Sequence, residues 1–343
     1  MPSKLSDVAR LAGVSVATVS NVVNHPHRVA TATRARVESV IDELGFTPNR
    51  NARALVVGTT DSIGLVVFDL TNSLFVDIAR GSQRRAREKG YVVQVGSSDS
   101  DVEQQAEHLR AFDAAQVSGI VLAPMHDAPE SIERLRRHGR PVVIVNHDPT
   151  HTDACRVLVD NEQAGFIATR HLTDLGARRI AVVGGHRDYQ PVSLRIEGAN
   201  RAVREHGGTV VLVEAPVDGL EIVDGDAAGA WIAALEPEDR PDAVLAITDV
   251  LAMAIVNRLT AEGIRVPDDV RVMGCDHNTA AWGGSIPLSS VSLRGEALGE
   301  HAIELLFAEM DEPVAHVHQT ITLAPSLMVR ESTAGRSPVA PPS

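Results

Sequence analysis

Aromatic side chains make up only 3% of this 343-residue chain, so aliphatic residues must supply most of its packing. Its two cysteines, Cys155 and Cys275, are far apart and outside any CxxC pair, which favours buried thiols in a reducing cytoplasm. No apolar run approaches the roughly 20 residues that span a bilayer. Met1–Asp7 also lacks the apolar region of a secretion signal. These shortages favour a cytoplasmic protein with no membrane partner and two or three aliphatic-cored domains.

The net charge of −13 is unevenly distributed along the chain. Residues 1–57 hold seven Lys and Arg against four Asp and Glu, a charge of +3. The remaining residues hold 25 against 41, a charge of −16. Screening over about 8 Å at physiological salt prevents distant acidic residues from cancelling a small basic module. The overall acidity is therefore compatible with an N-terminal segment that binds DNA.

Residues 5–24 have the pattern of two short helices around a tight turn. Two apolar stripes at helical spacing run along this segment: Val8, Leu11 and Ala12, then Val19, Val22 and Val23. Gly13 stands where the first helix must end in a left-handed residue. Ser15 stands where a hydroxyl can cap the second helix. This pattern predicts a helix-turn-helix whose second helix enters the major groove.

A third helix is predicted over residues 31–44. Its apolar stripe would close a small core: Val37, Val40, Ile41 and Leu44. Ala30 is a poor N-cap because it has no side-chain oxygen, whereas Gly45 ends the helix well. Pro48 prevents continuation of this helix, and residues 49–55 form a segment too short to be a stable helix alone in water. We expect that segment to be disordered until something pairs with it.

From residue 61 onward, short β-branched runs alternate with amphipathic helices, as in parallel sheets. The first series of runs comprises 63–68, 91–95, 119–123 and 142–145, with helices expected at 74–89, 102–116 and 129–138. The second series comprises 179–183, 210–213, 243–247 and 270–273. The predicted fold class is an all-α helix-turn-helix head followed by an α/β core of two doubly wound parallel-sheet lobes. Ligands of such lobes bind at the carboxyl ends of the strands.

Motifs spread over nearly the whole chain carry a resemblance to a known family. They occupy residues 7–15, 17–20, 44–50, 52–55, 63–67 and 327–333. On these motifs the chain resembles the lactose-repressor (LacI/GalR) family of transcriptional regulators, whose core is similar to periplasmic sugar-binding proteins. The resemblance implies five regions: a head at 1–48, a hinge helix and linker at 49–60, a first lobe at 61–160 with 292–323, a second lobe at 161–291 with 324–333, and a disordered tail at 334–343.

The resemblance also implies which residues contact double-stranded operator DNA. The implied DNA-binding residues are Ser15, Val16, Ala17, Thr18, Ser20, Asn21, Arg28, Asn49, Ala52 and Leu55. Val16, Ala17 and Asn21 would face base edges, with Ser15, Thr18 and Ser20 nearer the phosphates. The hinge would fold on DNA against its two-fold mate and insert Leu55 into a minor-groove step. Many relatives have Arg where this chain has Asn21, which predicts an altered base preference because Asn suits adenine.

A second implied site lies between the two lobes. The implied effector-binding residues are Asp69, Leu74, Phe75, Asn146, Tyr189, Ser193, Arg195, Thr248, Asp249 and Asp276. Their chemistry suits a sugar or related polyol, since Asp249 and Asp276 can accept from hydroxyls and Arg195 can donate a fork. Simpler interpretations stay open: Arg195 as a salt-bridge residue, Asp276 as a loop cap, and Phe75 as core.

Other patterns favour no chemistry. No phosphate-binding GxGxxG or GxxxxGK[ST] follows a strand, so we expect no nucleotide cofactor. His316 and His318 could share a strand face, but they have no Cys or carboxylate at a recognised spacing, so we expect no metal. No nucleophile and base can be paired, so we expect no enzyme. We expect a homodimeric, effector-controlled repressor that binds a pseudo-palindromic operator. The alternatives are a solute-binding protein for transport and a regulator with a nucleoside or purine-type corepressor.

Overall fold

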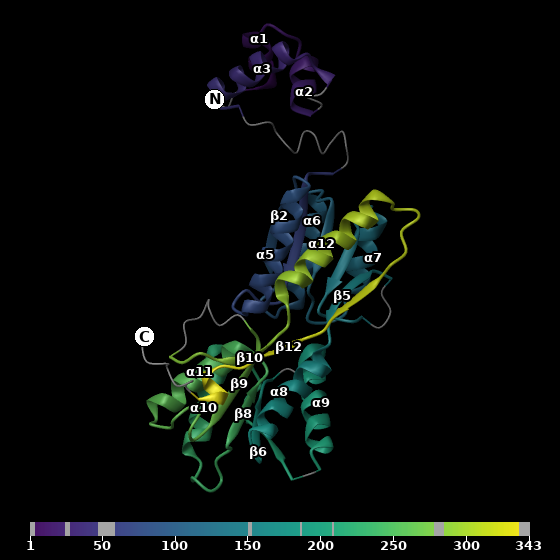
Figure 1. The fold of residues 1–343 in the computed structure, drawn as a ribbon. Helices are drawn as coiled ribbons and strands as arrows, with labels where there is room; N and C mark the ends of the chain where they lie inside the picture. The colour runs from purple at the N-terminus through teal and green to yellow at the C-terminus, as the bar shows by residue number, and fades with distance from the viewer. Residues whose placement is uncertain are drawn as a thin grey trace, which may run out of the picture. The chain divides into compact units, whose positions relative to one another are not determined.

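The computed structural model describes residues 4–24, 28–46, 59–149, 153–185, 187–207, 209–277 and 285–335. The chain divides into a head that ends at Thr60 and a body that begins at Asp61 (Figure 1). Within these ranges, no helix combines the length and apolarity needed to cross a membrane.

The described residues of the head pack as three helices. Its helices are α1 (Leu5–Ala12), α2 (Val16–Asn24) and α3 (Thr31–Leu44). The buried residues at its centre are Val8, Ala9, Ala12, Val19, Val22 and Val37. Gly13 and Gly45 end α1 and α3 in the left-handed region, with φ of 63° and 57°, which glycine adopts without strain. A helix-turn-helix head was predicted, and this arrangement confirms it.

The apolar stripe of α1 differs from the prediction. Leu11 is 50% exposed, and Ala9 takes its place against the core. The buried face of α1 therefore consists of Val8, Ala9 and Ala12. Ser15 caps α2 as predicted, because its Oγ accepts from the backbone N–H of Thr18 at 3.1 Å. Ala30 makes no side-chain cap bond to α3.

The first lobe of the body is a six-stranded sheet covered by helices. Its strands, in spatial order, are β11 (Thr320–Leu323), β5 (Cys155–Val159), β4 (Val142–Val145), β3 (Gly119–Leu122), β1 (Ser62–Val67) and β2 (Val92–Ser97). All neighbouring strands are parallel. The helices of this lobe are α5 (Ser73–Glu88), α6 (Val102–Ala114), α7 (Pro129–Arg137) and α12 (Gly295–Asp311) (Figure 1).

The second lobe repeats this plan with one reversed edge. Its strands, in spatial order, are β12 (Ser326–Met328), β10 (Ser289–Ser292), β9 (Arg271–Asp276), β8 (Ala243–Ala246), β6 (Arg179–Val183) and β7 (Val211–Glu214). Only β12 is antiparallel to its neighbour in this sheet. The helices are α8 (Asn161–Asp174), α9 (Gln190–Glu205), α10 (Ile222–Ala234), α11 (Asp249–Ala261) and α13 (Glu331–Ala334).

The chain passes between the two sheets at three places. It leaves the first lobe after β5, returns between β10 and α12, and leaves again between β11 and β12. Two parallel α/β lobes were predicted, and this topology confirms the fold class. Of the tail predicted to be disordered, Ala334 is the last residue of α13, and residues 336–343 lie outside the described part.

Two glycines allow α8 and α9 to pack in close contact. A Cβ atom on Gly165 would lie 1.8 Å from the carbonyl oxygen of Arg195, and one on Gly198 would lie 1.8 Å from that of Glu162. No larger residue fits at such distances. This close approach fixes the backbone of Arg195 beside the first turn of α8, where the chain has just crossed between lobes.

Candidate functional site

Polar residues from the second lobe gather at the carboxyl ends of its strands, facing the first lobe. Asp276 ends β9, and Thr248 and Asp249 follow β8. Asn146 follows β4 of the first lobe. All four are buried, at 3% exposed or less. Open α/β sheets bind ligands at this edge, so the fold delivers predicted effector residues to the expected place.

Arg195 lies at the centre of this cluster. Its Nε donates to Oδ1 of Asn161 at 2.9 Å, and its Nη1 donates to the carbonyl oxygen of Ile247 at 2.7 Å. The same Nη1 lies 3.9 Å from Oδ1 of Asp276. A guanidinium can satisfy several acceptors at once because it carries five donors in a fixed plane. Arg195 therefore joins α9 to the ends of β8 and β9, and it is not a surface salt-bridge residue.

Asp276 is the least satisfied group of the cluster. Its Oδ2 accepts from the backbone N–H of Asp249 at 3.4 Å, and its Oδ1 has no hydrogen-bond partner among the described residues. Burial raises the pKa of Asp276 well above its usual value. Arg195 and the side chain of Asn72 oppose this rise, and the negative charge of Asp249 adds to it. A buried carboxylate with an open acceptor position favours a ligand that donates a hydrogen bond.

Aromatic rings meet across the lobes. Phe68, directly after β1, stacks on Tyr189 of the second lobe, with ring centroids 5.0 Å apart and planes 10° apart. Phe75 lies 5.9 Å from Phe68 and is 2% exposed. Burial raises the pKa of the Tyr189 hydroxyl, so it stays protonated and able to donate. The site thus combines flat apolar surfaces with the polar cluster around Arg195.

Amide groups also join the lobes. Asn161 donates to Oδ1 of Asn146 at 3.0 Å, while its own Oδ1 accepts from Arg195. The side chain of Gln190 accepts from the backbone N–H of Asp148 at 2.7 Å and donates to the carbonyl oxygen of Asp148 at 3.0 Å. These bonds hold the lobes closed against one another.

Several predicted effector residues make local contacts in this closed arrangement. Asp69 accepts from the backbone N–H of Thr71 at 2.7 Å, and Ser193 donates to the carbonyl oxygen of Arg187 at 2.6 Å. Thr248 caps α11, with Oγ1 accepting from the N–H of Leu251 at 3.3 Å. Asp249 accepts from Ser290, and Leu74 packs in the core of the body. These groups are held by contacts within the protein, whereas Oδ1 of Asp276 has no hydrogen-bond partner among the described residues.

Sequence reasoning missed Phe68 and Asn161. Phe68 was assigned to the first strand, yet it lies at the carboxyl end of β1, where side chains reach the site. Asn161 is the first residue of α8, directly after the chain crosses between lobes. Both follow the end of a strand in sequence, so strand-end position was the signal that could have found them.

The candidate DNA-reading surface lies on the outer face of α2. Val16, Ala17 and Asn21 are exposed, and Val16 is 47% exposed although it is apolar. The hydroxyls of Ser15 and Thr18 lie 2.8 Å apart at the start of the helix. Ser20 is half-buried, and Arg28 is exposed ahead of α3. The predicted hinge contacts Asn49, Ala52 and Leu55 lie outside the described residues.

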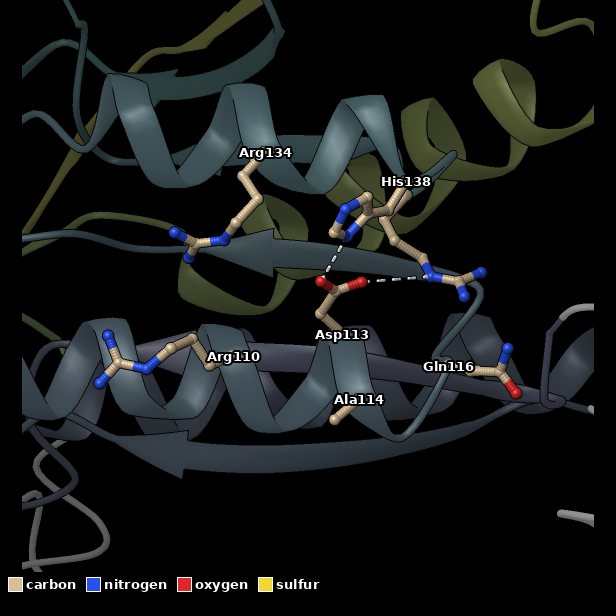
Figure 2. Close-up of a pocket in the computed structure, with 7 residues that line it drawn as sticks. Arg110, Asp113, Ala114, Gln116, Arg134 and His138 are labelled. Atoms are coloured by element: carbon tan, nitrogen blue, oxygen red, sulfur yellow. Dashed lines mark hydrogen bonds and ion pairs between the residues drawn. The ribbon is translucent and has the colours of Figure 1, made fainter.

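An open hollow of about 480 Å3 lies elsewhere on the first lobe, between α6 and α7. Figure 2 shows its lining side chains, with His138 directed toward Asp113. His138 Nδ1 lies 2.7 Å and Arg140 Nε lies 3.9 Å from the carboxylate of Asp113. Asp113 therefore pairs with two of the lining side chains, whereas Nη2 of Arg134 is buried without a hydrogen-bond partner among the described residues. None of the predicted effector residues lines this hollow.

Comparison with known proteins agrees with this architecture. Residues 4–49 match the model of bacterial regulatory proteins of the lacI family, and residues 169–333 match that of a periplasmic binding protein-like domain. The HTH-type transcriptional repressor PurR of Photobacterium profundum is 31% identical over 337 residues, covering 96% of this chain and 98% of PurR.

Two solved structures extend the likeness to the fold. The complex of the transcriptional regulator CelR with cellobiose is 28% identical, with a TM-score of 0.69, over 96% of this chain and 99% of CelR. The lac repressor dimer bound to operator and the anti-inducer ONPF is 25% identical, with a TM-score of 0.80, over 97% and 99%. Fold and site together define a DNA-binding transcriptional regulator with a two-lobed ligand-binding core. The chain belongs to the LacI family.

Proposed function

We propose that this protein represses transcription from the cytoplasm as a homodimer on a pseudo-palindromic operator, under the control of a small molecule bound between its lobes. Family membership supports a DNA-binding repressor over a solute-binding protein for transport. Two-fold protein symmetry is mirrored in the operator, so each head would bind one half-site.

A sugar or related polyol is the effector class that we propose. The observation that carries this proposal is the open Oδ1 of buried Asp276, beside the guanidinium of Arg195. A hydroxyl group can donate to that oxygen, and the stacked rings of Phe68 and Tyr189 offer an apolar face of the kind that covers a sugar ring. The structure of the CelR–cellobiose complex supports the same class.

A planar corepressor of the nucleoside or purine type is the second candidate. It is favoured by the nearly parallel rings of Phe68 and Tyr189, because a flat heterocycle can stack on either ring once the lobes separate. Such a ligand would also present N–H donors to Asp276. The two classes differ in what they require: a polyol depends mainly on Asp276, whereas a heterocycle depends mainly on the rings.

The ligand would act by changing how the lobes sit against one another. The contacts that hold them closed include the hydrogen bonds between Gln190 and Asp148 and the stacking of Phe68 on Tyr189. A ligand shifts this equilibrium only by its differential affinity for the two arrangements. The lobe angle would in turn set the spacing of the two hinge segments, which would fold only when close together on DNA.

The surfaces proposed for the dimer are the helices α5 and α6 and their counterparts α10 and α11. Apolar side chains stand exposed at the starts of two of these helices: Val102 of α6, at 54%, and Ile222 and Val223 of α10, at 58% and 68%. Exposed apolar residues at such positions are what a homodimer interface would cover.

A thermal-shift panel of sugars, sugar phosphates, polyols and purine bases tests the effector class. A polyol should raise the melting temperature of the wild type, and Asp276→Asn should lose that shift while Phe68→Leu keeps most of it. A heterocycle should show the opposite dependence on these two variants. If no compound of either class shifts the melting temperature, the proposed interlobe ligand chemistry is wrong.

Asn21 should determine one base of each half-site. We expect Asn21→Ala to weaken binding to the preferred operator by about 1–3 kcal/mol, roughly 5- to 150-fold, and to relax selectivity at one position. Asn21→Arg should move the preference at that position toward guanine. Gel shifts on a pseudo-palindromic fragment from the region upstream of the gene measure both. Ser39→Ala, at an exposed position of α3, serves as the control. An unchanged base preference in Asn21→Arg would remove Asn21 from the reading surface.

A further inference from the structure

Four side chains with metal-binding atoms meet at the amino end of the sheet of the first lobe. They are Cys155 at the start of β5, Glu309 in the last turns of α12, and His316 and His318 on the segment that leads into β11. Their ligand atoms, one sulfur, two imidazole nitrogens and one carboxylate oxygen, all lie within 4.8 Å of one another. Asp276 ends β9 in the sheet of the second lobe, and Asn146 follows the carboxyl end of β4, so the cluster at the amino end of the first sheet is separate from the interlobe site.

The separations within the cluster suit a small ion. Cys155 Sγ lies 3.1 Å from His316 Nε2 and 3.7 Å from His318 Nδ1, and His318 Nδ1 lies 3.9 Å from Glu309 Oε2. With bonds of about 2.0–2.3 Å, the ligand atoms of a tetrahedral zinc site stand roughly 3.3–3.7 Å apart. Changes of up to about 1 Å in these separations, from at most 4.8 Å, would therefore bring the four atoms around one zinc ion.

The burial of these side chains is a second, independent indication of a cation site. Cys155 is fully buried and Glu309 is 7% exposed, yet Oε2 of Glu309 has no hydrogen-bond partner among the described residues. A buried carboxylate oxygen without a partner is costly, and a cation satisfies it. The thiolate and the carboxylate together balance the charge of a divalent ion, while the two imidazoles bind as neutral ligands.

We propose that Cys155, Glu309, His316 and His318 form a structural Zn2+ site. Sulfur and imidazole ligands select zinc over magnesium or calcium, and four protein ligands leave no open position for catalysis. The ion would tie the connection between α12 and β11 to the start of β5. Residues 312–319, which carry both histidines, have no helix or strand of their own to fix them.

Zinc binding through Nδ1 requires one rearrangement around His318. In the structure its Nε2 accepts from Arg136 at 2.7 Å, and Arg136 Nη2 also lies 3.3 Å from Oε1 of Glu309. When Nδ1 binds the metal, Nε2 carries the proton and needs an acceptor. The carboxylate of Asp153 is 3.8 Å from Nε2, and Arg136 can turn wholly to Glu309. A carboxylate behind a metal-bound histidine is a common way of fixing the ring.

The experiment uses the full chain, purified without a histidine tag and stripped with a chelator. After addition of equimolar ZnCl2 and gel filtration, we expect one zinc per chain by mass spectrometry of the metal content. Co2+ in place of zinc should give a thiolate-to-cobalt charge-transfer band and the intense visible bands of tetrahedral geometry. Zinc should also raise the melting temperature, because it binds the folded state alone.

Two ligand variants and one control decide the outcome. Cys155→Ser and His316→Ala should weaken zinc binding at least about 100-fold, more than the loss of an outer partner does. Cys155→Ser should also abolish the charge-transfer band. His301→Ala, which removes a more exposed histidine of α12 paired with Glu304, should behave as the wild type. Substoichiometric zinc in the wild type, or equal zinc in all four proteins, would overturn the site. His316 is only half-buried on a loop, so its variant folds even if Cys155→Ser does not.

Discussion

Arg195→Ala is expected to abolish the effector response and to lower the free energy of unfolding by about 3–5 kcal/mol. The guanidinium is 3% exposed and donates to Asn161 and to the carbonyl oxygen of Ile247. Without it, these acceptors lose their donor and buried Asp276 loses its compensating charge, so its pKa rises further. A protonated Asp276 can no longer accept two hydroxyl groups from a ligand. Urea unfolding and operator titrations with and without effector measure the two effects.

A double variant separates stability from ligand recognition. Arg195→Ala with Asp276→Asn also removes the buried carboxylate that Arg195 compensates, so it should recover part of the lost stability while the effector response stays absent. Arg201→Ala, on the same helix but paired with Glu162 nearer the surface, should cost at most about 1 kcal/mol and keep the response. Operator affinity without effector should stay close to wild type in every folded variant. A wild-type response in Arg195→Ala would show that the cleft assignment is wrong.

Much of the fold follows from local pattern. Both sheets could be predicted because short β-branched runs alternate with amphipathic helices, and β1 and β4 are continuous apolar runs buried on both faces. The error at Leu11 has a packing cause: periodicity marks several neighbouring positions of a short helix as apolar, and only contact with the other helices selects among them. In the head, Ala9 lies in the core and Leu11 does not.

Site residues at strand ends could be predicted from the sequence. Site residues that are brought together by contact between the lobes could not. Asn146 and Asp276 follow strands, so the fold alone places them at the ligand edge. The partnership of Phe68 with Tyr189, and that of Asn161 with Arg195, depends on how two separately folded lobes close on each other. Local sequence patterns do not predict such contacts between lobes.

The four-residue cluster of the first lobe shows the same limit more sharply. Cys155 and His316 are 161 residues apart, so no spacing rule links them. They meet because β11 pairs in parallel with β5 at the edge of the sheet, which brings the segment before Thr320 beside the start of β5. The ligand residues could be read from the sequence, but only the pairing of β11 with β5 shows that they lie close together.

Leu55→Ala is expected to weaken specific operator binding by about 1.5–3 kcal/mol, roughly 10- to 150-fold, which is the worth of burying one leucine side chain. Leu55 lies outside the described residues, so this expectation rests on the family resemblance of the segment 49–57. An apolar wedge in the minor groove unstacks one base step and bends the duplex, which brings both heads onto their half-sites. Without the wedge, the bend should decrease and each head should contact its half-site less well.

Leu55→Met tests whether the wedge needs shape or only apolar bulk. Methionine is apolar and of similar volume, so this variant should keep most of the bend and affinity. Binding to unrelated DNA should be the same in all three proteins, because phosphate contacts dominate it. Fluorescence energy transfer between the ends of an operator fragment reports the bend, and circular dichroism reports helix formation by the hinge on DNA. Because a short hinge gains stable helix only through its partner on the duplex, Leu55→Ala should reduce both signals together. An undiminished bend in Leu55→Ala would mean that another residue opens the step.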